Sequence, residues 1–156
     1  MLLYTITTLG CKVNQSESDA LARALDASGW SCANTGQAAD LCIVNTCTVT
    51  GKASMQSRQA TRRAIRSHPG AKVVVTGCYA QTEPDALSKI EGIDAIVPGA
   101  EKALIPEMVT GLGRDISSSV SSRCTDATIA SAIPAGKHPH GRSRPFLKIQ
   151  DGCEAF

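Results

Sequence analysis

The sequence of 156 residues contains few aromatic side chains and no long hydrophobic run. Phe, Trp and Tyr together make up 3% of the residues, whereas the apolar fraction is 42%. We therefore expect a packed core of Val, Ile, Leu and Ala, because an apolar fraction of this size excludes a wholly disordered chain. No stretch approaches the roughly 18 consecutive apolar residues that a membrane helix needs. The net charge of +2 points to no class of partner on its own.

Several short motifs are also absent. The chain contains neither G-x-G-x-x-G nor G-x-x-x-x-G-K-S/T, which argues against the alternative of a stand-alone α/β module for a nucleotide or phosphate. No C-x-x-C pair occurs, which argues against a thioredoxin-like redox centre. No charged and then apolar leader precedes the first predicted strand, so we expect no signal peptide, no membrane association and a cytoplasmic location.

Cysteine, by contrast, is abundant. Seven occur, an odd number, in a chain longer than the small scaffolds that disulfides hold together. In a reducing cytoplasm we expect reduced thiols, so each cysteine is a buried apolar side chain, a ligand or a nucleophile. The seven are Cys11, Cys32, Cys42, Cys47, Cys78, Cys124 and Cys153.

Patterns typical of strands and helices alternate along the first 110 residues. Strands are predicted at residues 2–8, 41–45, 72–76 and 94–97. Helices are predicted from a capping box with Ser16 as N-cap, at 52–67, from Thr82 as N-cap, and at 101–109. This alternation predicts an α/β fold, with an open, mainly parallel, Rossmann-like sheet flanked by helices.

The pattern changes after residue 110. Residues 111–142 hold a serine cluster, prolines and glycines with few large apolar side chains, so we expect a linker there. Residues 144–150 are again typical of a strand and lead to a Gly-Cys pair. We therefore expect residues 1–110 to form one complete domain and 143–156 to be the first strand of a second, truncated domain.

Cys11, Cys47 and Cys78 each follow a predicted strand. Because the carboxyl ends of parallel strands meet at one edge, with neighbours about 4.8 Å apart, we expect the three thiols to converge there. The N-terminus of the helix behind each loop would lower the pKa of the thiol and favour the thiolate, the form that binds metal. Their long spacing does not fit the closely spaced cysteine pairs of zinc fingers.

The three thiols predict an iron–sulfur cluster with three protein ligands and one open iron. Three small apolar side chains at tight turns, or a thiol redox sensor, are the alternatives from the residues alone. Cys42 falls inside a predicted strand and is expected in the core. Cys32, in a predicted loop, and Cys124, in the linker, are expected to be incidental thiols. The role of Cys153 depends on the residues that would follow position 156.

Two further groups of side chains each have two open interpretations. Asn14, Asn45 and Thr46 flank the cysteines and could either donate hydrogen bonds to cluster sulfurs or shape the turns. Basic residues recur at i, i+4 and i+8 on the predicted helix 52–67, as Arg58, Arg62 and Arg66. This stripe is either a solvated helix face or a contact for the phosphates of a nucleic acid.

Three cysteine-containing segments resemble the amino-terminal domain of the radical-SAM methylthiotransferases. They are residues 8–19 (TLGCKVNQSESD), 44–50 (VNTCTVT) and 75–81 (VTGCYAQ). Residues 149–153 (IQDGC) look like the entry to the catalytic barrel of that family. The residues after the first cysteine, 12–15 (KVNQ), are most similar to those of the branch that methylthiolates N6-threonylcarbamoyladenosine in tRNA. The alternatives are the branches that act on isopentenyladenosine or on a ribosomal protein.

The resemblance implies a set of cofactors and partners. Cys11, Cys47 and Cys78 would bind an auxiliary 4Fe–4S cluster, and Cys153 would be the first ligand of the radical-SAM 4Fe–4S cluster. The full-length enzyme would hold both clusters, use S-adenosyl-L-methionine, modify a tRNA substrate and receive electrons from a donor protein. The chain stops before the other cysteines of the C-x3-C-x2-C motif, so we expect an inactive, monomeric fragment.

Overall fold

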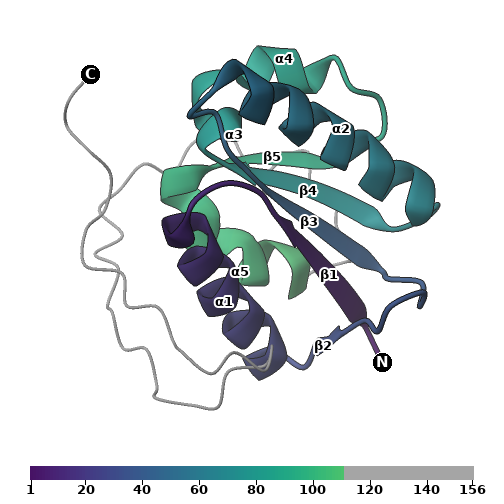
Figure 1. Cartoon of the computed structure of the whole chain (residues 1–156). Coiled ribbons are helices and arrows are strands. Elements are labelled where there is room, and N and C mark those ends of the chain that lie inside the picture. The colour runs from purple at the N-terminus through teal and green to yellow at the C-terminus, as the bar shows by residue number, and fades with distance from the viewer. Residues whose placement is uncertain (111–156) are drawn as a thin grey trace.

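The computed structural model describes residues 1–110 of the chain (Figure 1). The predicted linker 111–142, the predicted strand in 143–156 and the thiols of Cys124 and Cys153 lie outside the described residues. The elements in chain order are β1 (Leu3–Thr8), α1 (Lys12–Ala27), β2 (Ser31–Cys32), β3 (Leu41–Thr46), α2 (Gly51–Ser67), β4 (Lys72–Gly77), α3 (Cys78–Thr82), α4 (Pro84–Ser88), β5 (Ala95–Pro98), the 3-10 helix η1 (Gly99–Leu104) and α5 (Ile105–Thr110).

The five strands form one sheet in the order β2-β1-β3-β4-β5, and every pairing is parallel. This confirms the predicted open α/β fold. The first connection places β2 on one side of β1, and all later strands are added on the other side. In such a sheet, the crevice at the carboxyl ends of the two strands where the order reverses is the usual ligand site. Here those strands are β1 and β3.

Helices cover both faces of the sheet (Figure 1). Leu41 and Ile43 of β3 point into a core shared with α1 and α5. Cys42 and Val44 point to the opposite face, into a core shared with α2, α3 and α4. All six residues of β3 are buried, as a strand covered on both faces requires, which explains its unbroken apolar run. In residues 1–110 no helix is both long and apolar enough to cross a bilayer.

Helix α1 starts earlier than predicted. Its N-cap is Cys11, whose side chain makes no capping hydrogen bond, and Ser16 lies inside the helix. The prediction of Ser16 as N-cap is therefore wrong. The Asn14 side chain in the first turn bonds the backbone of Leu9 and Thr46, so a contact outside the helix fixes where it begins.

Three smaller differences concern short elements. Thr82 ends α3 and does not cap the next helix, because α4 starts with Pro84 after Glu83. The helix predicted over 101–109 is divided into η1 and α5. Cys32 lies in β2 and not in a loop, since this strand of two residues is too short to show a periodic pattern.

Candidate functional site

The three proposed ligands stand at the carboxyl ends of three neighbouring strands. Cys11 follows β1 and caps α1, Cys47 follows β3 directly, and Cys78 follows β4 as the first residue of α3. Since β1, β3 and β4 are adjacent in the sheet, the fold brings the three cysteines to one edge. The side chains of Cys11 and Cys78 are exposed, whereas Cys47 is 3% exposed.

Gly10 brings the segment before Cys11 into contact with Cys47. Its φ of +94° is one that residues with a side chain rarely adopt. A Cβ at this position would lie 2.5 Å from the Cys47 Cβ and 2.6 Å from its Sγ. Only glycine fits, so the approach of the first loop to the second depends on this residue.

Gly77 brings the segment before Cys78 into contact with the end of β3. Its φ is +99°, and an added Cβ would lie 2.6 Å from both the Asn45 Oδ1 and the Thr46 nitrogen. Thr46 and Gly77 are also paired in the sheet, and Cys47 and Cys78 are the next residues. The backbone therefore approaches closely beside the cysteines on both sides of β3.

Ser57 of α2 holds the backbone of Cys47. Its Oγ accepts a hydrogen bond from the Cys47 N–H at 3.2 Å and donates one to the Cys47 carbonyl at 3.0 Å. Both groups are buried, so the loop after β3 has a fixed path. The sequence analysis missed Ser57, because a lone serine in a helix carries no signal of a partner ten residues away.

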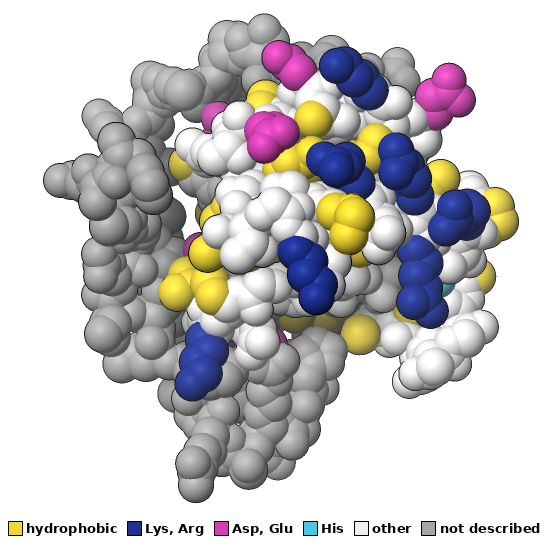
Figure 2. Space-filling view, turned by 45° about the horizontal axis from the view of Figure 1, so that its top comes forward, with side chains coloured by type: hydrophobic (Ala, Val, Ile, Leu, Met, Phe, Trp, Pro, Cys, Tyr) yellow, Lys and Arg dark blue, Asp and Glu magenta, His cyan; other side chains and the backbone are white. Residues whose placement is uncertain are grey.

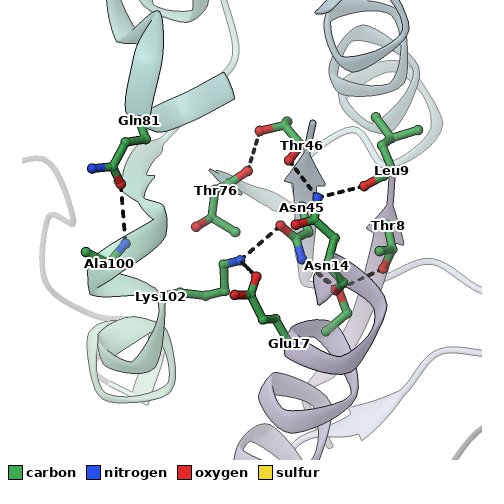
Figure 3. A network of polar contacts seen from close by, with 11 residues as sticks. Thr8, Leu9, Asn14, Glu17, Asn45, Thr46, Thr76, Gln81, Ala100 and Lys102 are labelled. Atoms are coloured by element: carbon green, nitrogen blue, oxygen red, sulfur yellow. Dashed lines mark hydrogen bonds and ion pairs between the residues drawn. The ribbon is translucent and has the colours of Figure 1, made fainter. Parts of the chain in front are cut away.

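Two asparagines tie the strand ends to each other (Figure 3). The Asn14 Nδ2 donates to the carbonyls of Leu9 (2.8 Å) and Thr46 (2.9 Å). The Asn45 Nδ2 donates to the Asn14 carbonyl and the Ser18 Oγ, both at 3.0 Å. Each amide group has two hydrogens, and both are used. Asn14 and Asn45 therefore shape the loops, and neither amide group has a hydrogen left to donate to a cluster sulfur.

Thr46 also links neighbouring strand ends. Its hydroxyl donates to the Thr76 carbonyl at 2.5 Å and so joins the end of β3 to the end of β4. The Thr76 hydroxyl itself is buried and, among the described residues, has no hydrogen-bond partner. It stands two residues before Cys78, at the same edge of the sheet.

A buried lysine that the sequence analysis missed completes the edge (Figure 3). Lys102 of η1 is 8% exposed. Its Nζ donates to the Asn45 Oδ1 at 3.1 Å and forms an ion pair with Glu17 of α1. A buried ammonium needs such partners, because desolvation of an unpaired charge is costly. Lys102 thus joins η1, α1 and β3 at the carboxyl edge.

The thiol of Cys78 responds to its surroundings at this edge. Although Cys78 is exposed as a residue, partial desolvation of its thiol raises the pKa of that thiol. The charges of Cys47, Glu17 and Cys11 raise this pKa further, and that of Lys102 lowers it. A net lowering of the thiol pKa, as expected, is therefore wrong for Cys78, because desolvation is the largest contribution. A thiol with a raised pKa is mainly protonated at neutral pH.

The residues at this edge fit an iron–sulfur group in donor type. Between residues 1 and 110, no three His, Cys, Asp or Glu side chains stand as a group that could hold a metal ion. The edge nevertheless offers three thiols, the donor that iron–sulfur clusters use, on strand ends brought together by Gly10 and Gly77. Cys11 and Cys78 are exposed, so their side chains can change rotamer without moving the core.

The other described cysteines lie elsewhere. Cys42 is 1% exposed and belongs to the core on the α2 face, which confirms the prediction from its strand position. Burial raises the pKa of its thiol to about 11. Cys32 is exposed in β2, the strand at the far side of β1 from β3.

Comparison with known proteins shows the family of this chain. A family model described as "Uncharacterized protein family UPF0004" matches residues 3–99. The threonylcarbamoyladenosine tRNA methylthiotransferase MtaB of Bacillus subtilis is 34% identical over 162 residues, which cover 100% of this chain and 35% of the relative. The enzyme of the same name from Aquifex aeolicus is 35% identical, over 96% of this chain and 36% of the relative.

A relative whose name states another substrate is also similar to this chain. The ribosomal protein uS12 methylthiotransferase RimO of a Roseiflexus species is 29% identical, over 96% of this chain and 36% of the relative. The chain spans about a third of the length of these relatives. All three matched segments include the three cysteine loops of the sheet edge. The chain therefore belongs to the UPF0004 family, the amino-terminal domain of methylthiotransferases.

Proposed function

We propose that this domain holds an auxiliary 4Fe–4S cluster in an enzyme that adds a methylthio group to C2 of N6-threonylcarbamoyladenosine in tRNA. The observation that carries the proposal is the placement of Cys11, Cys47 and Cys78 at the carboxyl ends of three adjacent parallel strands. Membership of the family and the activity of the relatives from Bacillus and Aquifex, as their names state it, support the reaction and the substrate.

Each residue at the edge has a definite task in this proposal. Cys11, Cys47 and Cys78 supply three thiolates, and a cluster held by three protein ligands offers an iron that can bind sulfur. Gly10 and Gly77 let the loops approach, and Ser57 holds Cys47 in place. With their amide hydrogens used within the protein, the asparagines orient the ligands indirectly.

The remaining parts of the proposal concern the rest of the enzyme. Cys153 is proposed as the first ligand of a second 4Fe–4S cluster, which binds S-adenosyl-L-methionine. The boundaries 1–110, 111–142 and 143–156 stay predictions for the cluster-binding domain, the linker and the start of the radical-SAM domain. The proposed enzyme works in the cytoplasm with an electron donor protein. The 156-residue chain alone is expected to be monomeric and inactive.

Analysis of tRNA nucleosides by mass spectrometry tests this function. In cells that lack the protein, we expect 2-methylthio-N6-threonylcarbamoyladenosine to disappear and its unmethylthiolated precursor to accumulate. The wild-type enzyme and a Cys32→Ala control should restore the product, whereas Cys47→Ala should not. An unchanged nucleoside would contradict the proposal.

The same measurement separates the alternatives. Loss of the methylthio group from isopentenyladenosine, or from a ribosomal protein, would assign the enzyme to another branch of the family. The similarity to the ribosomal protein methylthiotransferase of Roseiflexus is the observation behind the second of these. A non-enzymatic thiol or metal-binding module would change none of the three products.

A further inference from the structure

Charge is unevenly distributed over the described domain. Residues 1–110 contain ten Lys or Arg and ten Asp or Glu, so they carry no formal net charge. Yet residues 41–82 contain six Lys or Arg and no acid. Five of these six basic residues lie on α2: Lys52, Arg58, Arg62, Arg63 and Arg66. A neutral domain thus concentrates half of its positive charge on one helix.

Four of these cations have charged groups that form no ion pair within residues 1–110. Lys52, Arg62, Arg63 and Arg66 are exposed, and we call them the α2 basic face. In the described part of the chain none of the four forms an ion pair, whereas Lys72 pairs with Asp94 and Lys102 with Glu17. Figure 2 shows basic side chains spread over the surface toward the viewer, with acidic side chains near its upper rim.

Arg58 connects this face to the cysteine edge. Its Nη1 donates to the Tyr79 hydroxyl at 2.8 Å, and its guanidinium carbon lies 5.9 Å from the centroid of that ring. Tyr79 is fully buried and follows Cys78 in α3. Arg58 therefore contacts the residue next to the third proposed ligand, and Arg62, Arg63 and Arg66 follow it along α2.

We propose that the α2 basic face binds the sugar–phosphate backbone of the RNA whose base is modified at the cysteine edge. This inference rests on the proposed function. Exposed guanidinium groups without acidic partners bind phosphate oxygens through paired hydrogen bonds. Arg62 and Arg66 are four residues apart, so they repeat along one side of the helix at about 6 Å.

The surroundings of these cations favour a phosphate backbone over a protein surface. Protein interfaces need buried aromatic or large apolar anchors. Of the large apolar side chains exposed in residues 1–110, only Met55 lies on α2. The described aromatic residues Tyr4, Trp30 and Tyr79 are all buried, so no base can stack on them. The contact should therefore depend on charge and not on base sequence.

Binding of an unmodified tRNA transcript to the protein, followed by fluorescence anisotropy over a range of salt concentrations, tests the inference. In Arg62→Gln/Arg66→Gln, we expect about tenfold weaker binding at low salt. The slope of log K against log salt concentration should be smaller by about 1.5 to 2, because two phosphate contacts are lost. The matched control Arg23→Gln/Lys89→Gln removes two charges from other elements and should change affinity less than about twofold. A transcript of shuffled sequence should show the same pattern.

Three results would overturn the inference. The first is that the wild-type protein does not bind tRNA at low salt, and the second is that both double variants lose affinity for tRNA equally. The third is that Arg62→Gln/Arg66→Gln weakens binding of polyglutamate but leaves tRNA binding unchanged, which would indicate an acidic protein partner. Thermal melting of both variants checks that they fold. The measurement needs no iron, so Cys47→Ala should bind tRNA normally. Failure of the nucleoside assay with intact α2-dependent binding would therefore contradict the proposed function and not this inference.

Discussion

At the residue scale, two glycines decide how closely the cysteine segments approach each other. A side chain at Gly10 would occupy the space of the Cys47 side chain, and one at Gly77 would meet the end of β3. Both residues have positive φ, so backbone conformation and contact distance exclude other residues there. The thiols can share one edge because a glycine directly precedes two of the three cysteines.

Gly10→Ala is predicted to destabilise the protein by about 3 kcal/mol, since a positive φ costs about 1 to 2 kcal/mol and overpacking adds about 1 to 3 kcal/mol. The matched control is Gly29→Ala, where φ is +86° but no atom lies within 4 Å of an added Cβ. It should cost only about 1 to 2 kcal/mol. Urea unfolding measures both values, and equal losses would show that Gly10 does not contact Cys47 as described.

A second residue-scale prediction concerns Cys42. Burial raises the pKa of its thiol from the ordinary value of 9.0 to about 11. The folded protein keeps this proton where the unfolded chain loses it, so the free energy of unfolding should fall by about 2 to 3 kcal/mol as the pH rises between these values. Urea unfolding of Cys42→Ala should show a smaller fall over the same interval. An identical slope in both proteins would refute the assignment.

At the element scale, contacts between helices and strand ends set the path of the site loops. Ser57 fixes the loop after β3 to α2, and Lys102 fixes η1 to α1 and β3. The small buried side chains of α2, Ser57, Thr61 and Ala64, let this helix approach the sheet closely. Ser57 thus contributes both to the packing of α2 on the sheet and to the placement of Cys47.

Ser57→Ala is predicted to loosen the Cys47 loop. It leaves the Cys47 N–H and carbonyl without their partner, which costs about 1 to 3 kcal/mol. Cys47 is nearly inaccessible in the wild-type protein. In the variant it should be alkylated faster by a small thiol reagent, as followed by peptide mass spectrometry. The control Thr61→Val removes a hydroxyl that bonds only within the helix, to the Ser57 carbonyl. If Cys47 reacts equally slowly in both variants, Ser57 does not hold this loop.

Strands and helices with strong patterns could be predicted from the sequence, but contacts between them could not. The apolar runs of β3 and β4 and the periodicity of α2 determine these elements locally. The start of α1 was misplaced because Ser16 and Asp19 match a capping box, while the true N-cap, Cys11, makes no capping bond. Partners ten to 85 residues apart, such as Lys102 and Glu17, leave no trace in a local pattern.

At the scale of the whole molecule, the candidate site follows from topology. Parallel strands in neighbouring positions put Cys11, Cys47 and Cys78 at one edge, and this much could be predicted from three cysteines that each follow a strand pattern. The pKa of Cys78 could not be predicted, because it depends on burial and on the charges of four residues distant in the sequence. The fold provides the convergence, and distant polar side chains set its electrostatics.

The central claim is that these three thiols, and no other thiols of the domain, hold a 4Fe–4S cluster. Anaerobic incubation with iron and sulfide, followed by metal analysis of Cys153→Ala, tests it directly because this variant removes the proposed ligand of the second cluster. We expect about four iron and four sulfide per chain. Further change of Cys11, Cys47 or Cys78 to alanine should abolish uptake, whereas changing Cys32 should not. Iron uptake that survives loss of Cys47, or a folded protein that takes up none, would contradict the claim.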